Sequence, residues 1–192
     1  MQAFIAISAG LLSLIATLPY IVDIVRGKVL LARSTRLMYV LLLFFALLQQ
    51  KDLESGWIIV LTISELAIAV IIFFFSFKYG VGGIDNIDKA CYLLLFLNLV
   101  IWQSTSNALV GLHLSIIADA VATFPLIHKT YKNPNSETIT FYAIGSAAAF
   151  LIIFAETNLS YSTIIFPLYI AGINLLVVLL IRRKRSNANI AQ

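Results

Sequence analysis

The chain has 192 residues, of which 61% are hydrophobic and only 11% are charged, with a net charge of +4 and a mean hydropathy of +0.98. A soluble domain carries about a quarter charged residues to cover its surface, and a secreted disulfide scaffold needs more than the single cysteine, Cys91. The composition therefore excludes a soluble globular domain, a disordered chain and a disulfide framework. It predicts a chain that lies mostly in lipid.

Seven apolar segments approach the length of about 20 residues that crosses a bilayer as an α-helix. Their apolar runs lack the alternation of strands, and a helix satisfies its own backbone hydrogen bonds in lipid. We therefore expect an all-α integral membrane protein with seven transmembrane helices, of which the second and fourth are the shortest. In chain order the helices span roughly 3–24, 36–50, 57–77, 90–104, 107–128, 138–155 and 160–181.

The basic residues gather on one side of these helices. Seven spans place 12 of the 13 Lys and Arg residues on that side and only Lys51 on the other. Cytoplasmic loops carry such an excess, so we expect the N-terminus outside, the C-terminus in the cytoplasm and a location in the plasma (inner) membrane. The net charge then reflects contact with anionic lipid, and we expect no nucleic-acid partner. The residues on the basic side are Arg26, Lys28, Arg33, Arg36, Lys78, Lys89, Lys129, Lys132, Arg182, Arg183, Lys184 and Arg185.

The sequence also repeats itself. ATLPYI at 16–21, near the end of the first predicted helix, matches ATFPLI at 122–127, near the end of the fifth. A basic loop, a shorter helix, an outer turn and a third helix follow each copy. The repeat predicts two parallel three-helix bundles joined by a linker helix (3+1+3), with a solute site between the halves. We expect the first bundle at 1–80, the linker at 81–105, the second bundle at 106–185 and a polar tail at 186–192.

A proline near the inner end of the first helix of each bundle carries a family resemblance. With Pro19 and Pro125 in these places, the chain resembles the PQ-loop superfamily, which includes the SWEET and SemiSWEET sugar carriers and the lysosomal cystine and cationic amino-acid exporters. The dipeptides here are Pro19-Tyr20 and Pro125-Leu126, where the superfamily has Pro-Gln. The resemblance implies the 3+1+3 fold and an alternating-access carrier, but a shared fold does not name the solute.

The same prolines are candidate hinges. Proline removes one backbone hydrogen bond from a helix and kinks it, so Pro19 and Pro125 are places where the bundles could flex; static kinks that only shape packing are the alternative. Asp23 follows Pro19 by about one turn and lies near Arg26. An ion pair there would latch the inner gate, whereas the alternative is a solvated helix end. The glycine-rich segment 80–83 is expected to be a flexible turn on the basic side.

Three ionisable residues fall within predicted spans, where a charged group costs about 2.5–3.5 kcal/mol. They are Glu65 in the third helix and His113 and Asp119 in the fifth. No Lys or Arg lies inside a span to pair with the acids, so each acid must be neutral, hydrogen-bonded or facing water. Asp119 is the best candidate for coupling transport to a proton, and Glu65 is the second. The alternatives are structural acids and a histidine that is hydrogen-bonded within the bundle.

Amides within the spans complete the candidate pathway. Asn98 and Asn174 can form hydrogen bonds between helices, which is the usual role of such amides in membranes. The resemblance to SWEET carriers implies a solute contact for Asn174, because those carriers use an asparagine in the last span together with a tryptophan. No tryptophan lies in the last span here. Acids without stacked aromatics make a sugar site less favoured than a site for another polar solute.

Other classes of protein lack their characteristic residues. An enzyme needs a nucleophile and base, or a metal cluster, and the sequence has neither, so we expect no catalytic residues, cofactor or metal. A receptor that reads its ligand with basic cavity residues is disfavoured, because His113 is the only basic residue expected there. The sequence therefore predicts a secondary transporter of a small polar solute, alone or with a proton. The alternative is a non-transporting receptor or lipid-handling protein on the same fold; the oligomeric state is left open.

Overall fold

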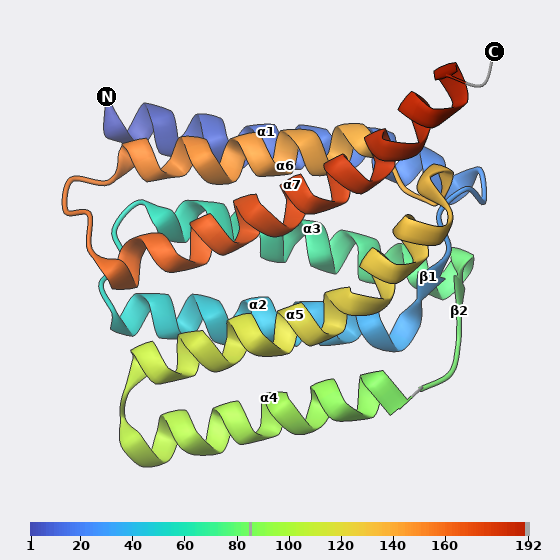
Figure 1. Cartoon of the computed structure of the whole chain (residues 1–192). Coiled ribbons are helices and arrows are strands. Elements are labelled where there is room, and N and C mark those ends of the chain that lie inside the picture. Colours follow the sequence, from blue (N-terminus) through green and yellow to red (C-terminus); the bar gives the residue numbers. More distant parts are fainter. Residues whose placement is uncertain (85, 191–192) are drawn as a thin grey trace.

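The structure, a computed structural model, describes residues 1–84 and 86–190. Within these residues the chain consists of α-helices and short 3-10 helices joined by loops, with one pair of two-residue strands (Figure 1). The prediction of an all-α fold is confirmed. Of the polar tail predicted over 186–192, residues 191–192 lie outside the described residues. The α-helices are α1 (Gln2–Val25), α2 (Arg33–Asp52), α3 (Ile58–Tyr79), α4 (Asn86–Thr105), α5 (Ala108–Lys132), α6 (Ile139–Leu151) and α7 (Tyr161–Ile190), the 3-10 helices are η1 (Pro134–Ser136) and η2 (Ile152–Ala155), and the strands are β1 (Leu31–Ala32) and β2 (Gly80–Val81).

Five helices, α1, α3, α4, α5 and α7, are long and apolar enough to cross a membrane, which indicates a multi-pass membrane protein. Of the other two, α2 has 20 residues but carries Arg33 and Arg36 in its first turn, and α6 has 13 residues before it tightens into η2. The expectation that the second and fourth helices are the shortest is wrong. Helix α4 reaches 20 residues because it begins in a polar stretch at Asn86, and α6 is the shortest α-helix of the described residues.

The helices pack in the same order in the two parts of the chain. In the first half (α1–α3), α3 packs against both α1 and α2; in the second half (α5–α7), α7 packs against both α5 and α6. Between the halves the contacts are reciprocal, because α1 packs on α6 and α2 packs on α5, while α3 touches α7. Helix α4 lies at the edge, against α5 and α2 (Figure 1).

Small side chains form the contact between α1 and α6. Ala6 and Ala9 of α1 and Ala148 and Ala149 of α6 are fully buried in one cluster. Alanine lets two helix backbones approach closely, which is the usual basis of helix packing in membranes. The alanine-rich sequence of these helices thus explains why the first helix of one half packs on the second helix of the other.

The two ends of the helices differ in charge and in packing. The segments linking α1 to α2, α3 to α4 and α5 to α6 lie together at one end, which we call the basic end (Figure 1). At the opposite end, the alanine cluster continues into larger buried side chains, among them Ile58, Leu112, Ile152 and Phe166. The opposite end is therefore filled by a packed apolar core that joins both halves.

Two short strands fasten the basic end of the first half. Gly80 and Val81 of β2 pair in parallel with Leu31 and Ala32 of β1. Arg33 then donates hydrogen bonds to the last-turn carbonyls of α3, at Ser76 (3.4 Å) and Phe77 (3.3 Å). The expectation of a flexible glycine-rich turn at 80–83 is therefore wrong for its first two residues. Backbone pairing with a distant loop holds them.

Candidate functional site

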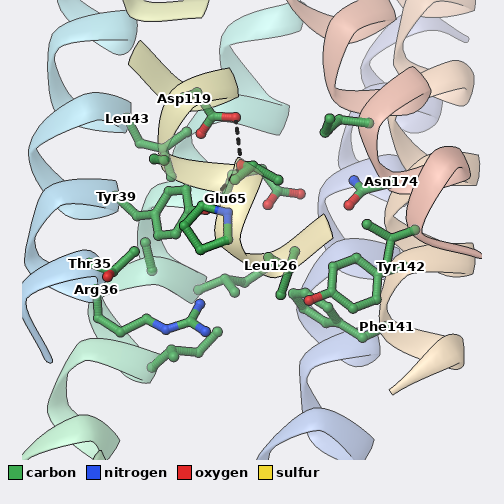
Figure 2. Close-up of a pocket in the computed structure, with 18 of the residues that line it drawn as sticks. Thr35, Arg36, Tyr39, Leu43, Glu65, Asp119, Leu126, Phe141, Tyr142 and Asn174 are labelled. Carbon is green, nitrogen blue, oxygen red and sulfur yellow. Dashed lines mark hydrogen bonds between the residues drawn. The ribbon is translucent and has the colours of Figure 1, made fainter. Parts of the chain in front are cut away.

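A cavity of about 290 Å³ lies between the two halves, towards the basic end. Helices α2, α3, α5, α6 and α7 all contribute to its wall, so neither half forms it alone (Figure 2). Leu30 and Ala32, two exposed residues of the segment between α1 and α2, also line it. The cavity therefore extends to the basic end, whereas the apolar core blocks the opposite end.

Asp119 of α5 lies on the cavity wall within a chain of hydroxyl groups. Tyr169 of α7 donates a hydrogen bond of 2.5 Å to Oδ2 of Asp119, and Thr123 donates a longer one of 3.4 Å to the same atom. The hydroxyl of Tyr39 on α2 lies 3.0 Å from that of Thr123. This chain of hydrogen bonds thus connects α2 of the first half with α5 and α7 of the second half, and it ends at the carboxyl group of Asp119.

Glu65 of α3 and Asn174 of α7 face each other in the same cavity (Figure 2). Both also line a recess of about 40 Å³ beside α1, together with Ser13 and Gly145. The amide of Asn174 fills the space over Gly145, since a Cβ there would lie 3.2 Å from its Nδ2. By the repeat, Ser13 of α1 corresponds to Asp119 of α5, so each half places a polar group from its first helix at this depth.

Two basic side chains also line the cavity, Arg36 of α2 and Lys129 of α5. The expectation that no basic residue other than His113 would be found there is wrong. Both residues sit at the end of an apolar run, where long side chains extend well beyond their own backbone position. Lys129 forms an ion pair of 2.5 Å with Glu137, which also accepts a hydrogen bond of 2.9 Å from Tyr142.

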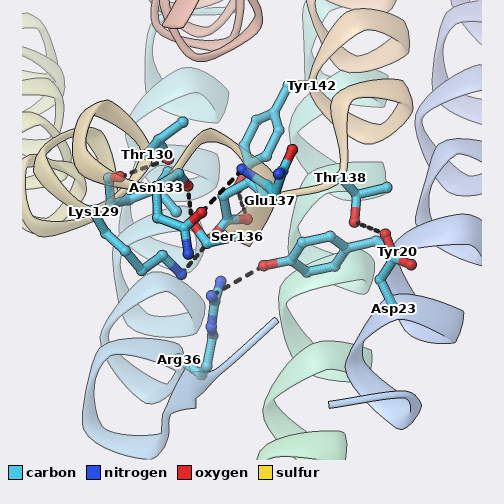
Figure 3. A network of polar contacts seen from close by, with 12 residues as sticks. Tyr20, Asp23, Arg36, Lys129, Thr130, Asn133, Ser136, Glu137, Thr138 and Tyr142 are labelled. Carbon is cyan, nitrogen blue, oxygen red and sulfur yellow. Dashed lines mark hydrogen bonds and ion pairs between the residues drawn. The ribbon is translucent and has the colours of Figure 1, made fainter. Parts of the chain in front are cut away.

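The halves also meet at the basic end, beside the cavity (Figure 3). Asp23 of α1 accepts a hydrogen bond of 2.6 Å from Thr138, just before α6, and forms an ion pair of 2.7 Å with Lys28. The ring of Tyr20 stacks on that of Phe141, with 4.4 Å between centroids. Asp23 is therefore paired within its own loop, with Lys28 rather than Arg26, and bonded to the other half.

Asn98 lies away from the cavity, in a closed ring of three buried polar side chains. Gln49 of α2 donates to Asn98 of α4 (3.0 Å), Asn98 donates to Ser115 of α5 (2.7 Å), and Ser115 donates back to Gln49 (2.9 Å). Gln49 also fills the space over Gly111, where a Cβ would lie 2.6 Å from Nε2. The ring links α4 to α2 of the first half and α5 of the second half, so Asn98 has a role in helix packing here.

His113 lies near the opposite end of α5, also apart from the cavity. Its Nε2 is 2.7 Å from the hydroxyl of Tyr161 at the start of α7, and the two rings stack with 5.5 Å between centroids. Its Nδ1 is 2.7 Å from the carbonyl oxygen of Leu109. A neutral imidazole that donates from Nδ1 and accepts at Nε2 satisfies both contacts, so His113 joins α5 to α7 here.

The two repeated prolines occupy equivalent places in continuous helices. Pro19 lies inside α1 and Pro125 inside α5, and only Pro125 lines the cavity. Of the pathway residues predicted from sequence, Glu65, Asp119 and Asn174 come together here. The sequence reasoning missed Arg36, Lys129, Tyr39 and Tyr169 as cavity or contact residues. A single tyrosine within an apolar segment carries no signal of its own.

Comparison of the chain with models of known protein families, with characterised proteins and with solved structures finds no match. We therefore infer the function from the geometry of the cavity.

Proposed function

We propose that this chain is a secondary carrier that moves a small polar solute by alternating access, either alone or together with a proton. The observation that carries the proposal is the cavity between two repeated halves, which has acidic, basic and amide side chains in a mostly apolar wall and is closed at one end by a packed core. Internal repeats with a site between them are typical of transporters. The cavity volume of about 290 Å³ lies at the lower limit of pockets for drug-sized ligands, which favours a small solute.

The proposed fold is seven transmembrane helices in a 3+1+3 arrangement similar to the PQ-loop superfamily, with the basic end in the cytoplasm. The lengths of α2 and α6, the two helices outside the group of five long apolar ones, support this arrangement. At a rise of 1.5 Å per residue, the 20 residues of α2 extend about 30 Å, the thickness of a hydrocarbon core. Helix α6 with η2 extends about 27 Å. The reciprocal contacts of α1 with α6 and α2 with α5 support two equivalent bundles.

In this proposal the structure represents the state that opens inwards. Transport then requires the apolar core at the opposite end to separate while the contacts at the basic end tighten. Pro19 and Pro125 are the proposed hinges, because both lie in the first helix of a half, between the core and the basic end. Asp119 is the proposed coupling residue, since its carboxyl group borders the cavity and contacts α7 through Tyr169.

A receptor that binds its ligand without transport is the second candidate, and Arg36 and Lys129 in the cavity favour it. Uptake into proteoliposomes separates the two. We would measure uptake of labelled sugars, amino acids and organic acids by the wild-type chain, Asp119→Asn and the control Asp52→Asn, whose side chain is exposed at the opposite end. The carrier proposal predicts uptake that Asp119→Asn alters in rate or pH dependence and Asp52→Asn leaves unchanged. Binding of a solute without uptake would instead support the receptor.

A further inference from the structure

Arg36 differs from Lys129, the other basic side chain in the cavity wall, in having no ion-pair partner. The ion pairs of the described residues join Asp23 to Lys28 and Lys129 to Glu137, and Arg36 belongs to neither. Its Nη2 donates a hydrogen bond of 3.2 Å to the hydroxyl of Tyr20, a neutral group (Figure 3). The guanidinium also lies over the ring of Tyr39, 5.8 Å from its centroid.

One donor of this guanidinium is buried without any partner. Nε of Arg36 is inaccessible to solvent and has no hydrogen bond among the described residues. The charge of Glu137 acts on Arg36 from beyond ion-pair distance, and Glu137 is already paired with Lys129. A buried charge without an ion-pair partner of its own is costly, and an unsatisfied buried donor adds to that cost. An anion that binds in the cavity would give this guanidinium a counter-charge and hydrogen-bond acceptors.

We propose that Arg36 is the anion-binding residue of the cavity, and that the solute is a small carboxylic acid that also carries hydroxyl or ammonium groups. This inference rests on the proposed binding of a small solute in the cavity. A guanidinium presents a planar set of donors that matches a carboxylate. Tyr20 and Tyr39 hold that plane in place from two sides.

The deeper part of the cavity favours one kind of anion over another. Glu65, Asp119 and Asn174 lie deeper than Arg36 (Figure 2). Carboxylate and amide oxygens accept hydrogen bonds, so they favour solute groups that donate, namely hydroxyl or ammonium. Two acids in this part of the cavity repel a doubly charged phosphate more strongly than a single carboxylate. A solute with a single carboxylate and donor groups at its other end therefore matches both ends of the cavity.

Matched pairs of compounds test the carboxylate directly. We would measure thermal stabilisation of the full-length purified chain by serine and serinol, lactate and 1,2-propanediol, and gluconate and sorbitol. In each pair the second compound keeps the other groups and has a neutral hydroxymethyl group in place of the carboxylate. A charge-assisted hydrogen-bonded contact of this kind predicts apparent affinity for the acid that is about 10- to 100-fold higher than for its alcohol. Comparing the pairs also shows whether the other end prefers ammonium or hydroxyl.

Three variants assign the preference to Arg36. Arg36→Gln should abolish the preference of the acid over its alcohol, and Arg36→Lys should retain only part of it, because lysine keeps the charge without the planar donors. Lys132→Gln removes a positive charge from an exposed position at the same end and should leave the preference unchanged. The unfolding midpoint without ligand shows whether each variant is folded, and Arg36→Lys keeps the test valid if Arg36→Gln fails to fold.

The outcomes distinguish this inference from the proposed function. Equal binding of acids and alcohols by the wild-type chain, or an acid preference that survives in both Arg36 variants, would overturn the anion site. Uptake of a solute that has no carboxylate, with no uptake of its acid counterpart, would also overturn it while leaving the carrier intact. Acid binding that depends on Arg36 but gives no uptake would support the anion site and contradict the carrier.

Discussion

Tyr169 of α7 donates a hydrogen bond of 2.5 Å to the carboxyl group of Asp119 on α5, in the wall of the cavity between the two halves. The contact joins the first and third helices of the second half at the residue proposed to couple transport. A solute that takes the place of Tyr169 on Oδ2, or a proton that neutralises Asp119, would weaken this bond, and we therefore expect binding in the cavity to be linked to the packing of α7 on α5.

Removing the phenol hydroxyl should weaken that link. Tyr169→Phe deletes a charge-assisted or strong neutral hydrogen bond, and we expect a loss of unfolding free energy of about 1–2 kcal/mol. Because the partner is Asp119, the loss should be much smaller in the Asp119→Ala background, which has no acceptor for the hydroxyl. A double-mutant cycle measured by thermal unfolding in detergent checks this coupling. Additive effects of the two substitutions would contradict a direct bond.

The ring formed by Gln49, Asn98 and Ser115 predicts a stability effect without a binding effect. Asn98→Ala leaves two buried polar partners unsatisfied, and we expect a loss of about 1–3 kcal/mol in unfolding free energy. The control Gln103→Ala, an exposed residue of the same helix, should change stability little. Solute affinity should be unaltered in folded Asn98→Ala, because Asn98 does not line the cavity. A large drop in affinity at unchanged stability would contradict this placement.

Two helical glycines give a matched pair of substitutions. A Cβ at Gly172 meets nothing within 4 Å, so Gly172→Ala should raise stability by about 0.5–1 kcal/mol through helix propensity. A Cβ at Gly145 would lie 3.2 Å from Nδ2 of Asn174, so Gly145→Ala should push that amide into the cavity and weaken solute binding. Thermal unfolding and ligand titration of both variants check the pair. Equal ligand affinity in the two variants would show that Asn174 is not held by Gly145.

Apolar runs in the sequence located the helices well. The first predicted span, 3–24, differs from α1 (Gln2–Val25) by one residue at each end, because an apolar run bounded by charge fixes where a helix can lie in lipid. The short α6 was harder to predict, since Ile152–Ala155 continues the apolar run while the backbone tightens into η2. The pairing of β1 with β2 depends on contact between distant loops, which has no local signal.

The cavity was predictable only in part, because it depends on how each helix is rotated. Glu65 and Asp119 stand out in the sequence as acids in apolar segments, and both line the cavity. Asn98 has the same kind of signal, but its face of α4 turns towards Gln49 and Ser115. Arg36 gave no signal as a cavity residue, since it lies at the boundary of a predicted span and only its long side chain extends inwards.

The proposed orientation places the two ends of the helices on different sides of a membrane. Cysteine at Lys132 should react with a membrane-impermeant maleimide from the cytoplasmic side, and cysteine at Gln103 from the outer side, because both residues are exposed at opposite ends. The background is Cys91→Ala, which removes the buried native thiol. Sealed vesicles of the two orientations provide the measurement. Labelling of both positions from one side would contradict a membrane crossing by α5, the helix that lies between them.

The most direct test of the central claim is the accessibility of the cavity wall from the two sides of the membrane. Ala69 lines the cavity and is almost fully buried, so Ala69→Cys in the Cys91→Ala background introduces one small reporter there. A carrier that alternates between two states should expose this thiol to impermeant maleimide from both sides, and faster from the side of the basic end, which is cytoplasmic in the proposed orientation, because the cavity extends to that end. Labelling from the cytoplasmic side alone, while Lys132→Cys and Gln103→Cys each react from their own side, would show a pocket that never opens outwards and would contradict alternating access.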